Sequence, residues 1–205
     1  RGPRGALEVV GAAAKRTSGV RKGYIVDVDD TVRSVRDAAD AVTERTRRRI
    51  KQAYVSVGGI GLASHRSSSG IIAVSKADGE VTDLDVRRAV LKAEANLPAM
   101  PNRKVLHTIP VGFTLDGSPV FGRAAGMHGS KIEATVLFIS ALAQHVSDTI
   151  HAVEAAGIAV EDVGAAPLAA ARVTLTKSQR EAGCLLVNIG AGTVLYQNYP
   201  RVSLA

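Results

Sequence analysis

Residues 105–117 have the sequence Val-Leu-His-Thr-Ile-Pro-Val-Gly-Phe-Thr-Leu-Asp-Gly, and this stretch decides the fold of the middle of the chain. It is rich in β-branched and aromatic side chains, which favour strands. Asp116-Gly117 is a strong turn signal because both residue types tolerate positive φ. We therefore expect paired strands at 104–110 and 112–115, followed by a turn at 116–117.

One helix and one alternating strand flank this stretch. Thr82 followed by Asp85 has the spacing of a capping box, which predicts a helix start at this point. Apolar residues then recur at steps of three and four up to residue 97, and prolines follow at 98 and 101. Residues 131–139 alternate between apolar and polar, as in a half-buried strand.

The chain changes character at both ends of this middle region. Residues 67–137 consist of short strands around one helix, whereas longer helices are expected after residue 31 and after residue 142. More apolar strands are expected at 53–57 and 184–187, with a further strand at 6–13 and a polar loop at 64–69. This pattern predicts a small α+β module inserted into an α/β domain.

Composition excludes some classes of protein and favours others. Aromatic residues make up only 3% of the 205 residues and Trp is absent, which argues against a protein that stacks single-stranded bases. The formal net charge is +7, and its densest run, residues 45–51, lies at an expected helix end, where cations complement the helix dipole. We interpret that run as a solvated helix end and expect no nucleic-acid partner.

The single cysteine, Cys184, excludes a disulfide framework. No apolar stretch approaches the ~20 residues that span a bilayer, and no signal peptide is visible. These features predict a cytoplasmic protein.

The strongest candidate site is Asn188-Ile189-Gly190-Ala191-Gly192-Thr193, which follows an apolar strand. Two glycines allow the backbone to approach a ligand closely, and successive N–H groups can surround phosphate oxygens. A plain hairpin turn would explain the same residues. His65, His128, His145 and His151 lack metal-ligand spacing, His107 is interpreted as structural, and we expect no metal site or catalytic residues.

Several segments, taken in order, are similar to the bacterial cell-division protein FtsA family. Lys22-Gly-Tyr-Ile-Val-Asp-Val-Asp-Asp-Thr-Val resembles the KGxVxDxDxTV strand and helix of that family. Gln52-Ala-Tyr-Val-Ser-Val-Gly-Gly resembles the next strand. Gly70-Ile-Ile-Ala-Val-Ser and Glu80-Val-Thr-Asp-Leu-Asp-Val resemble its inserted subdomain, called 1C.

The second half of the chain continues the resemblance. Residues 105–117 are the closest match, and Gly126-Met-His-Gly-Ser-Lys-Ile-Glu-Ala resembles the GMxGxxLEA stretch. Ala166-Pro167-Leu-Ala-Ala-Ala resembles the first connecting helix of actin-like ATPases. Asn188 to Thr193 falls where the family has its second phosphate motif, DIGGGT. The order of these segments along the chain is the same as in the family, and this order favours the phosphate-loop interpretation of residues 188–193 over the plain turn.

The resemblance implies an α/β, actin-like (ribonuclease H-like) ATPase fold with an inserted SHS2-type subdomain 1C. Residues 1–66 and 138–181 would form subdomain 1A, residues 67–137 subdomain 1C, and residues 182–205 the start of subdomain 2A. The chain would be a fragment, because the first phosphate motif, the adenosine motif and the C-terminal amphipathic membrane helix are absent from it.

The resemblance also implies a function. Members tether FtsZ to the cytoplasmic face of the membrane at the division site, self-associate into filaments and recruit later division proteins. They bind ATP with Mg²⁺, here through Asn188, Gly190, Ala191, Gly192 and Thr193. Because Asn188 replaces the usual Asp, we expect weak or no ATPase activity. Because the first phosphate motif and the adenosine motif are absent, we also expect little nucleotide binding by this chain.

Two alternatives stay open. A pilus-assembly adaptor has the same actin-like fold and a similar insertion. A sugar kinase or chaperone ATPase would need a catalytic carboxylate and a different insertion, and residues 105–117 argue against it.

Overall fold

The computed structural model describes residues 8–190 and 193–199. The chain divides into two units, and each is described by itself. The first comprises the residues up to 61, 143–173 and 187–197. The second comprises residues 62–142, 174–186 and those from 198 onward. Every helix among the described residues is too short or too polar to cross a membrane.

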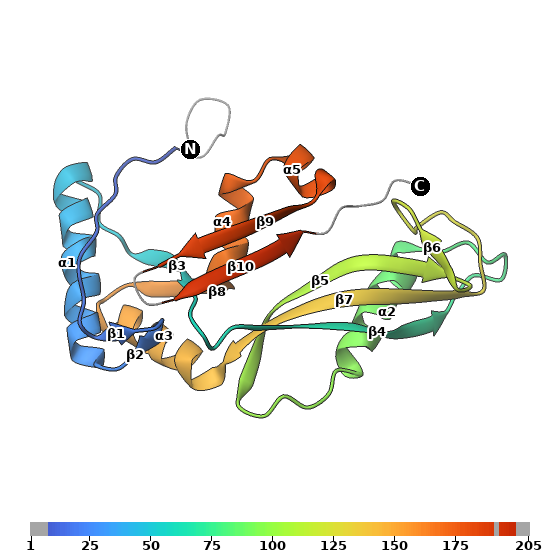
Figure 1. Ribbon diagram of the computed structural model, residues 1–205, viewed down its shortest axis with the longest axis horizontal. Helices are drawn as coiled ribbons and strands as arrows, with labels where there is room; N and C mark the ends of the chain where they lie inside the picture. The colour runs from blue at the N-terminus through green and yellow to red at the C-terminus, as the bar shows by residue number, and fades with distance from the viewer. Residues whose placement is uncertain (1–7, 191–192, 200–205) are drawn as a thin grey trace. The chain divides into compact units, whose positions relative to one another are not determined.

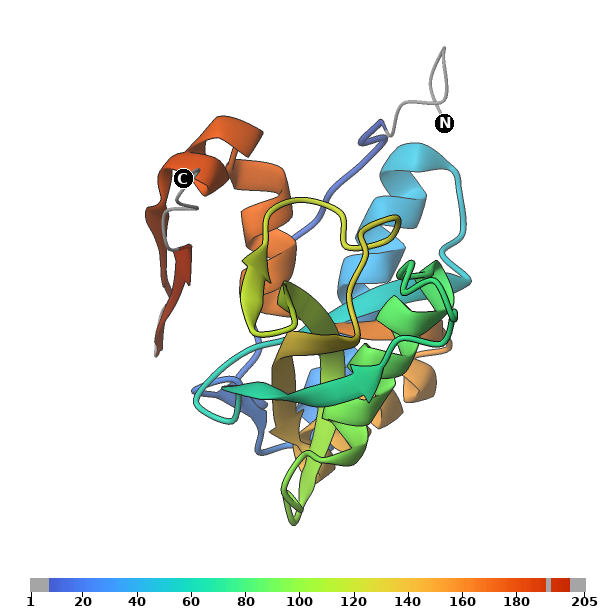
Figure 2. The ribbon, with the colours of Figure 1, turned by 90° about the vertical axis from the view of Figure 1, so that its right-hand side faces the viewer.

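The second unit is built on an antiparallel four-stranded sheet in the order β4-β7-β5-β6 (Figure 1). Its strands are β4 (Ala63–Ala73), β5 (Arg103–Leu115), β6 (Ser118–Val120) and β7 (Lys131–Leu142). Helix α2 (Asp83–Ala95) packs on β4 and β7 and covers one face of the sheet (Figure 2).

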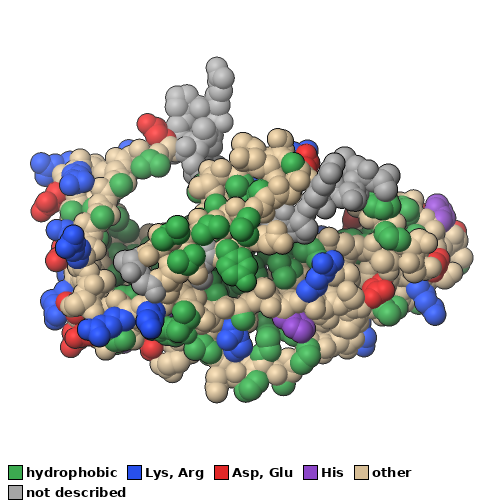
Figure 3. Space-filling view, viewed as in Figure 1, with side chains coloured by type: hydrophobic (Ala, Val, Ile, Leu, Met, Phe, Trp, Pro, Cys, Tyr) green, Lys and Arg blue, Asp and Glu red, His purple; other side chains and the backbone are tan. Residues whose placement is uncertain are grey.

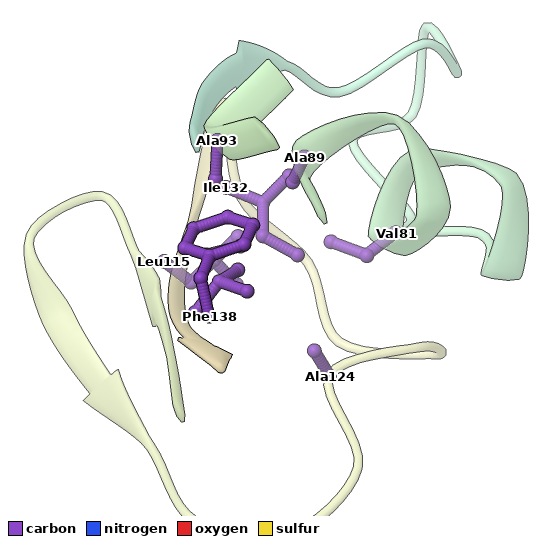
Figure 4. Close-up of a cluster of buried hydrophobic side chains, with 9 residues drawn as sticks. Val81, Ala89, Ala93, Leu115, Ala124, Ile132 and Phe138 are labelled. Carbon is purple, nitrogen blue, oxygen red and sulfur yellow. The ribbon is translucent and has the colours of Figure 1, made fainter. Parts of the chain in front are cut away.

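The core of this unit lies between β7 and α2. The alternation predicted at 131–139 is confirmed, since Ile132, Ala134, Val136 and Phe138 all have no exposed surface. Figure 4 shows Ile132 and Phe138 beside Ala89 of α2. Side chains that alternate along a strand point to one face of the sheet, so one face of β7 is fully buried.

A glycine in β4 lets α2 approach the sheet closely. A Cβ atom on Gly70 would lie 2.3 Å from the carbonyl oxygen of Ala89 and 2.9 Å from the Cβ atom of Ala93. Both distances are too short for real contacts. Any side chain here would therefore push α2 away from the sheet.

Two strand predictions in this unit are wrong. Residues 104–115 form one continuous strand, β5, which pairs with β7 and β6, and the two halves do not pair with each other. A register shift between Pro110 and Gly112 lets the strand continue past a residue that lacks an N–H donor. The expected polar loop at 64–69 lies within β4. The limits predicted for subdomain 1C, 67 and 137, fall inside β4 and β7.

The first unit combines two long helices with a small parallel sheet. Helices α1 (Val28–Thr46) and α3 (Ala143–Ala155) pack on each other, and β3 (Gln52–Val57) pairs in parallel with β8 (Ala159–Ala165). A short ribbon of β1 (Val20–Arg21) and β2 (Tyr24–Ile25) precedes α1. Helix α4 (Ala166–Thr174) follows β8. The buried residues of the first unit include Val57, Val146 and Ala165.

The strand expected at 6–13 is absent where the structure describes it, from residue 8 onward. This segment instead runs along α1, and the Arg45 guanidinium donates a hydrogen bond of 2.9 Å to the carbonyl of Ala12 (Figure 1). A Cβ on Gly11 would lie 2.4 Å from the Thr46 methyl, so the segment contacts the helix closely.

The last elements are α5 (Lys177–Ala182) and the two-stranded sheet of β9 (Cys184–Ile189) and β10 (Val194–Tyr199). The strand expected at 184–187 exists but is not buried. Leu185 is 59% exposed and Val187 is 46% exposed. Figure 3 shows hydrophobic side chains gathered over this pair of strands.

Candidate functional site

The predicted phosphate motif lies at the turn between β9 and β10. Asn188 and Ile189 end β9, and Thr193 directly precedes β10. The Gly190 amide donates a hydrogen bond of 2.9 Å to the carbonyl of Thr193, which closes the hairpin. Ala191 and Gly192 lie outside the described residues, so the motif is seen only at its two ends.

The hydrogen bond that closes the hairpin reduces the number of amides that could bind phosphate. The Gly190 amide is already engaged, so it is not a free donor in this conformation. A Cβ on Gly190 would lie 3.3 Å from the Thr193 carbonyl oxygen and 3.7 Å from its Oγ1 atom. The Thr193 hydroxyl therefore lies close to Gly190.

A separate cavity of about 340 Å³ lies within the first unit. Strand β3, helices α1 and α3 and the β1–β2 ribbon contribute its walls. Most of the lining is apolar, including Val35, Val55 and Val153, with Thr31 and Thr149 among the polar members. Both threonine hydroxyls donate to a backbone carbonyl one turn earlier in their own helix.

His145 is a further polar residue of this cavity, and sequence reasoning did not single it out. It is 6% exposed, and neither ring nitrogen has a hydrogen-bond partner among the described residues. Burial lowers the pKa of His145, opposed by the nearby Gly58 backbone and the Asp148 carboxylate. Helical periodicity alone would have placed it near the apolar line of Leu142 and Val146. Its unpartnered nitrogens could be known only from the packed structure.

The Asp30 carboxylate organises the segment before α1. It accepts hydrogen bonds from the hydroxyls of Thr17 and Ser18 and from the amides of Ser18 and Gly19. The Thr17 hydroxyl and the Gly19 amide contribute most to lowering the pKa of Asp30 to about 2. The side chain of Asp27 accepts the capping bond of α1 from the Asp30 amide.

In the described part of the chain, no group of three or more His, Cys, Asp or Glu side chains could hold a metal ion. The hairpin at 188–193 stays the predicted site, and the cavity beside His145 is a second feature, in which the imidazole nitrogens have no hydrogen-bond partner among the described residues.

Comparison with known proteins identifies the module in the second unit. The family model described as "SHS2 domain inserted in FTSA" matches residues 62–140. This segment contains the whole sheet of β4, β5, β6 and β7 up to its last residues, together with α2.

The likeness to curated proteins extends over most of the chain. The cell division protein FtsA of Pseudomonas aeruginosa is 33% identical over 190 residues, which cover 92% of this chain and 44% of that protein. FtsA of Borreliella burgdorferi is 30% identical over 187 residues, 91% of this chain and 45% of that protein. The chain is similar to FtsA proteins over more than nine tenths of its own length.

The chain spans about 45% of the length of these FtsA relatives. FtsA of Escherichia coli is 28% identical over 192 residues, 94% of this chain and 45% of that protein. Among solved structures, a chain of the "PilM-PilN type IV pilus biogenesis complex" has a TM-score of 0.57 at 10% identity, covering 91% of this chain and 50% of that one. The expected fold class, an α/β actin-like ATPase fold with an inserted SHS2 subdomain, is confirmed.

Proposed function

We propose that this chain is part of a cell-division scaffold of the FtsA type. In this proposal the whole protein tethers FtsZ to the cytoplasmic face of the membrane, self-associates in an actin-like way and helps to recruit later division proteins. The observation that carries the proposal is the sequence likeness to FtsA proteins, which extends over 91% or more of the chain and so includes residues of both units.

Residues 188–193 would contact the phosphates of ATP and its Mg²⁺ in the whole protein. The Thr193 hydroxyl, which lies close to Gly190, supports this assignment. Asn188 does not, because a neutral amide attracts Mg²⁺ less strongly than a carboxylate. We infer a nucleotide-binding scaffold with weak or no ATPase activity.

A second candidate is a pilus-assembly adaptor, favoured by the structural likeness to a chain of the PilM-PilN complex. At 10% identity that likeness supports the fold alone, whereas the FtsA relatives are similar in sequence over the same span. The cell-division proposal therefore rests on the better evidence.

A chimaera tests the proposal directly. The matched residues of E. coli FtsA are replaced by those of this chain, and the chimaera is expressed in cells depleted of their own FtsA. We expect it to concentrate at the division site and restore division. The same chimaera carrying Phe138→Asp, which places a charge in the SHS2 core, is expected to fail.

Two outcomes would contradict the proposal. A chimaera that accumulates to the level of E. coli FtsA but neither concentrates at midcell nor binds FtsZ in sedimentation would exclude the tethering role. A PilM chimaera made in the same way that restored pili would instead support the adaptor.

Deletion of residues 62–142 from the E. coli chimaera tests self-association. We expect the deletion to abolish filaments on lipid, and unchanged filaments would exclude self-association through subdomain 1C.

A further inference from the structure

Helix α2 carries leucines on the side that faces away from its own core. Asp85, Ala89 and Ala93 are fully buried and mark the side that contacts the sheet. Leu84 and Leu91 are both 62% exposed. At about 100° per residue, Leu91 lies almost opposite the buried line, and Leu84 lies within about 20° of Leu91.

The two leucines form a short apolar ridge with basic flanks. They are seven residues apart, which places them about 10 Å from each other along the helix. Exposed Arg87 lies on one side of the ridge, and exposed Arg88 and Lys92 lie on the other. We call these five residues the α2 ridge. A surface helix ordinarily presents polar residues along this line, so outward leucines call for an explanation.

The acidic neighbours of the ridge are largely engaged within the module. The Asp85 carboxylate is buried and lies 3.5 Å from Arg88. Asp83 accepts two hydrogen bonds, at 2.9 and 3.0 Å, from Arg123. Both acidic groups are thus partly neutralised. Because Arg88 is paired with Asp85, Arg87 and Lys92 are the cations that the ridge presents to solvent with little competition apart from Glu94.

The helix beneath the ridge is held firmly in place. Thr82 and Asp85 form a reciprocal capping box, and Ala89 and Ala93 pack closely on the sheet. A fixed helix loses little conformational entropy when a partner binds it. The ridge is therefore a preorganised surface.

We propose that the α2 ridge is a docking surface for an acidic amphipathic helix of a protein partner. The leucines would insert between apolar side chains of that helix, and its carboxylates would meet Arg87, Arg88 and Lys92 at the rim. Complementary charge would fix the orientation and speed the encounter, while the buried leucines would supply most of the affinity.

Charge argues against a second copy of this chain on the same surface. Two α2 helices packed face to face in antiparallel orientation would bring Arg88 and Lys92 of one copy toward those of the other, and like charges repel. A membrane is also disfavoured, because two leucines without an aromatic residue offer a small apolar area for insertion.

Peptide binding to the intact chain tests the proposal. The probe is a synthetic helical peptide with leucine at every third or fourth position and glutamate on both flanks; a matched peptide carries lysine in place of glutamate. We expect saturable binding of the acidic peptide alone, weakened by salt, with amide NMR shifts concentrated in residues 83–95. Leu84→Ser with Leu91→Ser should weaken binding by about tenfold or more.

Charge exchange provides the matched control. Arg87→Glu with Lys92→Glu should transfer the preference to the lysine peptide; Arg88 is left in place because it contacts buried Asp85. Equal binding of both peptides, shifts outside α2, or unchanged affinity in the serine variant would overturn the proposal. Binding to vesicles of phosphatidylcholine and phosphatidylglycerol in place of the peptide would assign the ridge to a membrane and would also overturn it.

Discussion

The ring centroids of Tyr24 and His145 lie 4.9 Å apart, with the ring planes tilted by 52°. Tyr24 belongs to the β1–β2 ribbon and His145 to the first turn of α3, so this contact joins two segments that are far apart in the sequence. Because the imidazole is buried and its nitrogens have no hydrogen-bond partner among the described residues, burial disfavours its charged form.

This burial predicts that stability falls on acidification. Burial holds the folded pKa of His145 below the ordinary value of 6.5, so the unfolded chain binds more protons below that pH. Stability should therefore be intact well above pH 6.5 and decrease as the pH falls below it, by up to about 1.4 kcal/mol per pH unit from this group. Urea unfolding at several pH values measures the slope of the unfolding free energy against pH.

Substitutions on α3 assign that slope to one residue. His145→Leu should flatten it, whereas His151→Gln, at an exposed position of the same helix, should leave it unchanged. An equal slope in wild type and His145→Leu would show that other groups cause it.

Asp85 is predicted to be the most important polar side chain of the SHS2 module. Its buried carboxylate accepts bonds from the Thr82 amide at 3.0 Å, the Thr82 hydroxyl at 2.6 Å and the Ser75 hydroxyl at 2.7 Å. Asp85→Ala would leave these donors unpaired and should cost about 2–4 kcal/mol of unfolding free energy. Asp83→Ala, at an exposed position paired with Arg123, should cost less than about 1 kcal/mol.

The same carboxylate has a defined pH window. Burial alone would raise the pKa of Asp85, but the bonds from Thr82 and Ser75 outweigh it and lower the pKa to about 2. The contribution of the Asp85 carboxylate to the free energy of unfolding should be complete above pH 3.8 and lost as the pH falls through about 2. Thermal unfolding at several acidic pH values is the measurement. An equal difference in melting temperature between wild type and Asp85→Ala at every pH would contradict the prediction.

Asp30 is predicted to hold residues 17–19 against the start of α1. Asp30→Asn removes the charge and one acceptor oxygen, so the amides of Ser18 and Gly19 should exchange with deuterium several-fold faster. Asp29→Asn, at the exposed neighbour, is the control. In wild type the protection should persist down to about pH 4 and disappear as the pH approaches 2. Fast exchange of both amides in wild type would contradict the prediction.

This chain is predicted to bind Mg-ATP weakly and not to hydrolyse it measurably. With the Gly190 amide engaged by Thr193, the hairpin offers fewer free donors. The loss of one charge-assisted bond, worth about 1.5–3 kcal/mol, would weaken binding by about tenfold or more. Calorimetry is the direct measurement, and micromolar affinity would contradict the prediction. In the E. coli chimaera, Asn188→Asp should raise the ATPase rate if the missing carboxylate limits it.

The features predicted correctly from the sequence depend on neighbours within one or two turns. The capping box needs only Thr82 and Asp85, three residues apart, and the face of β7 needs only the alternation at 131–139. Such patterns arise from backbone geometry, which is the same in every protein. The FtsA resemblance was equally visible, because it lies in the order of the motifs.

Tertiary structure alone decided what depends on distant partners. β5 continues past Pro110, and residues 64–69 extend β4, because β7 supplies hydrogen-bond partners to both strands. The strand expected at 6–13 found no such partner among the described residues and lies along α1. His145 is buried because Tyr24 and the residues around Gly58 pack on α3. Burial and strand pairing are properties of the folded chain, and a local sequence pattern does not contain them.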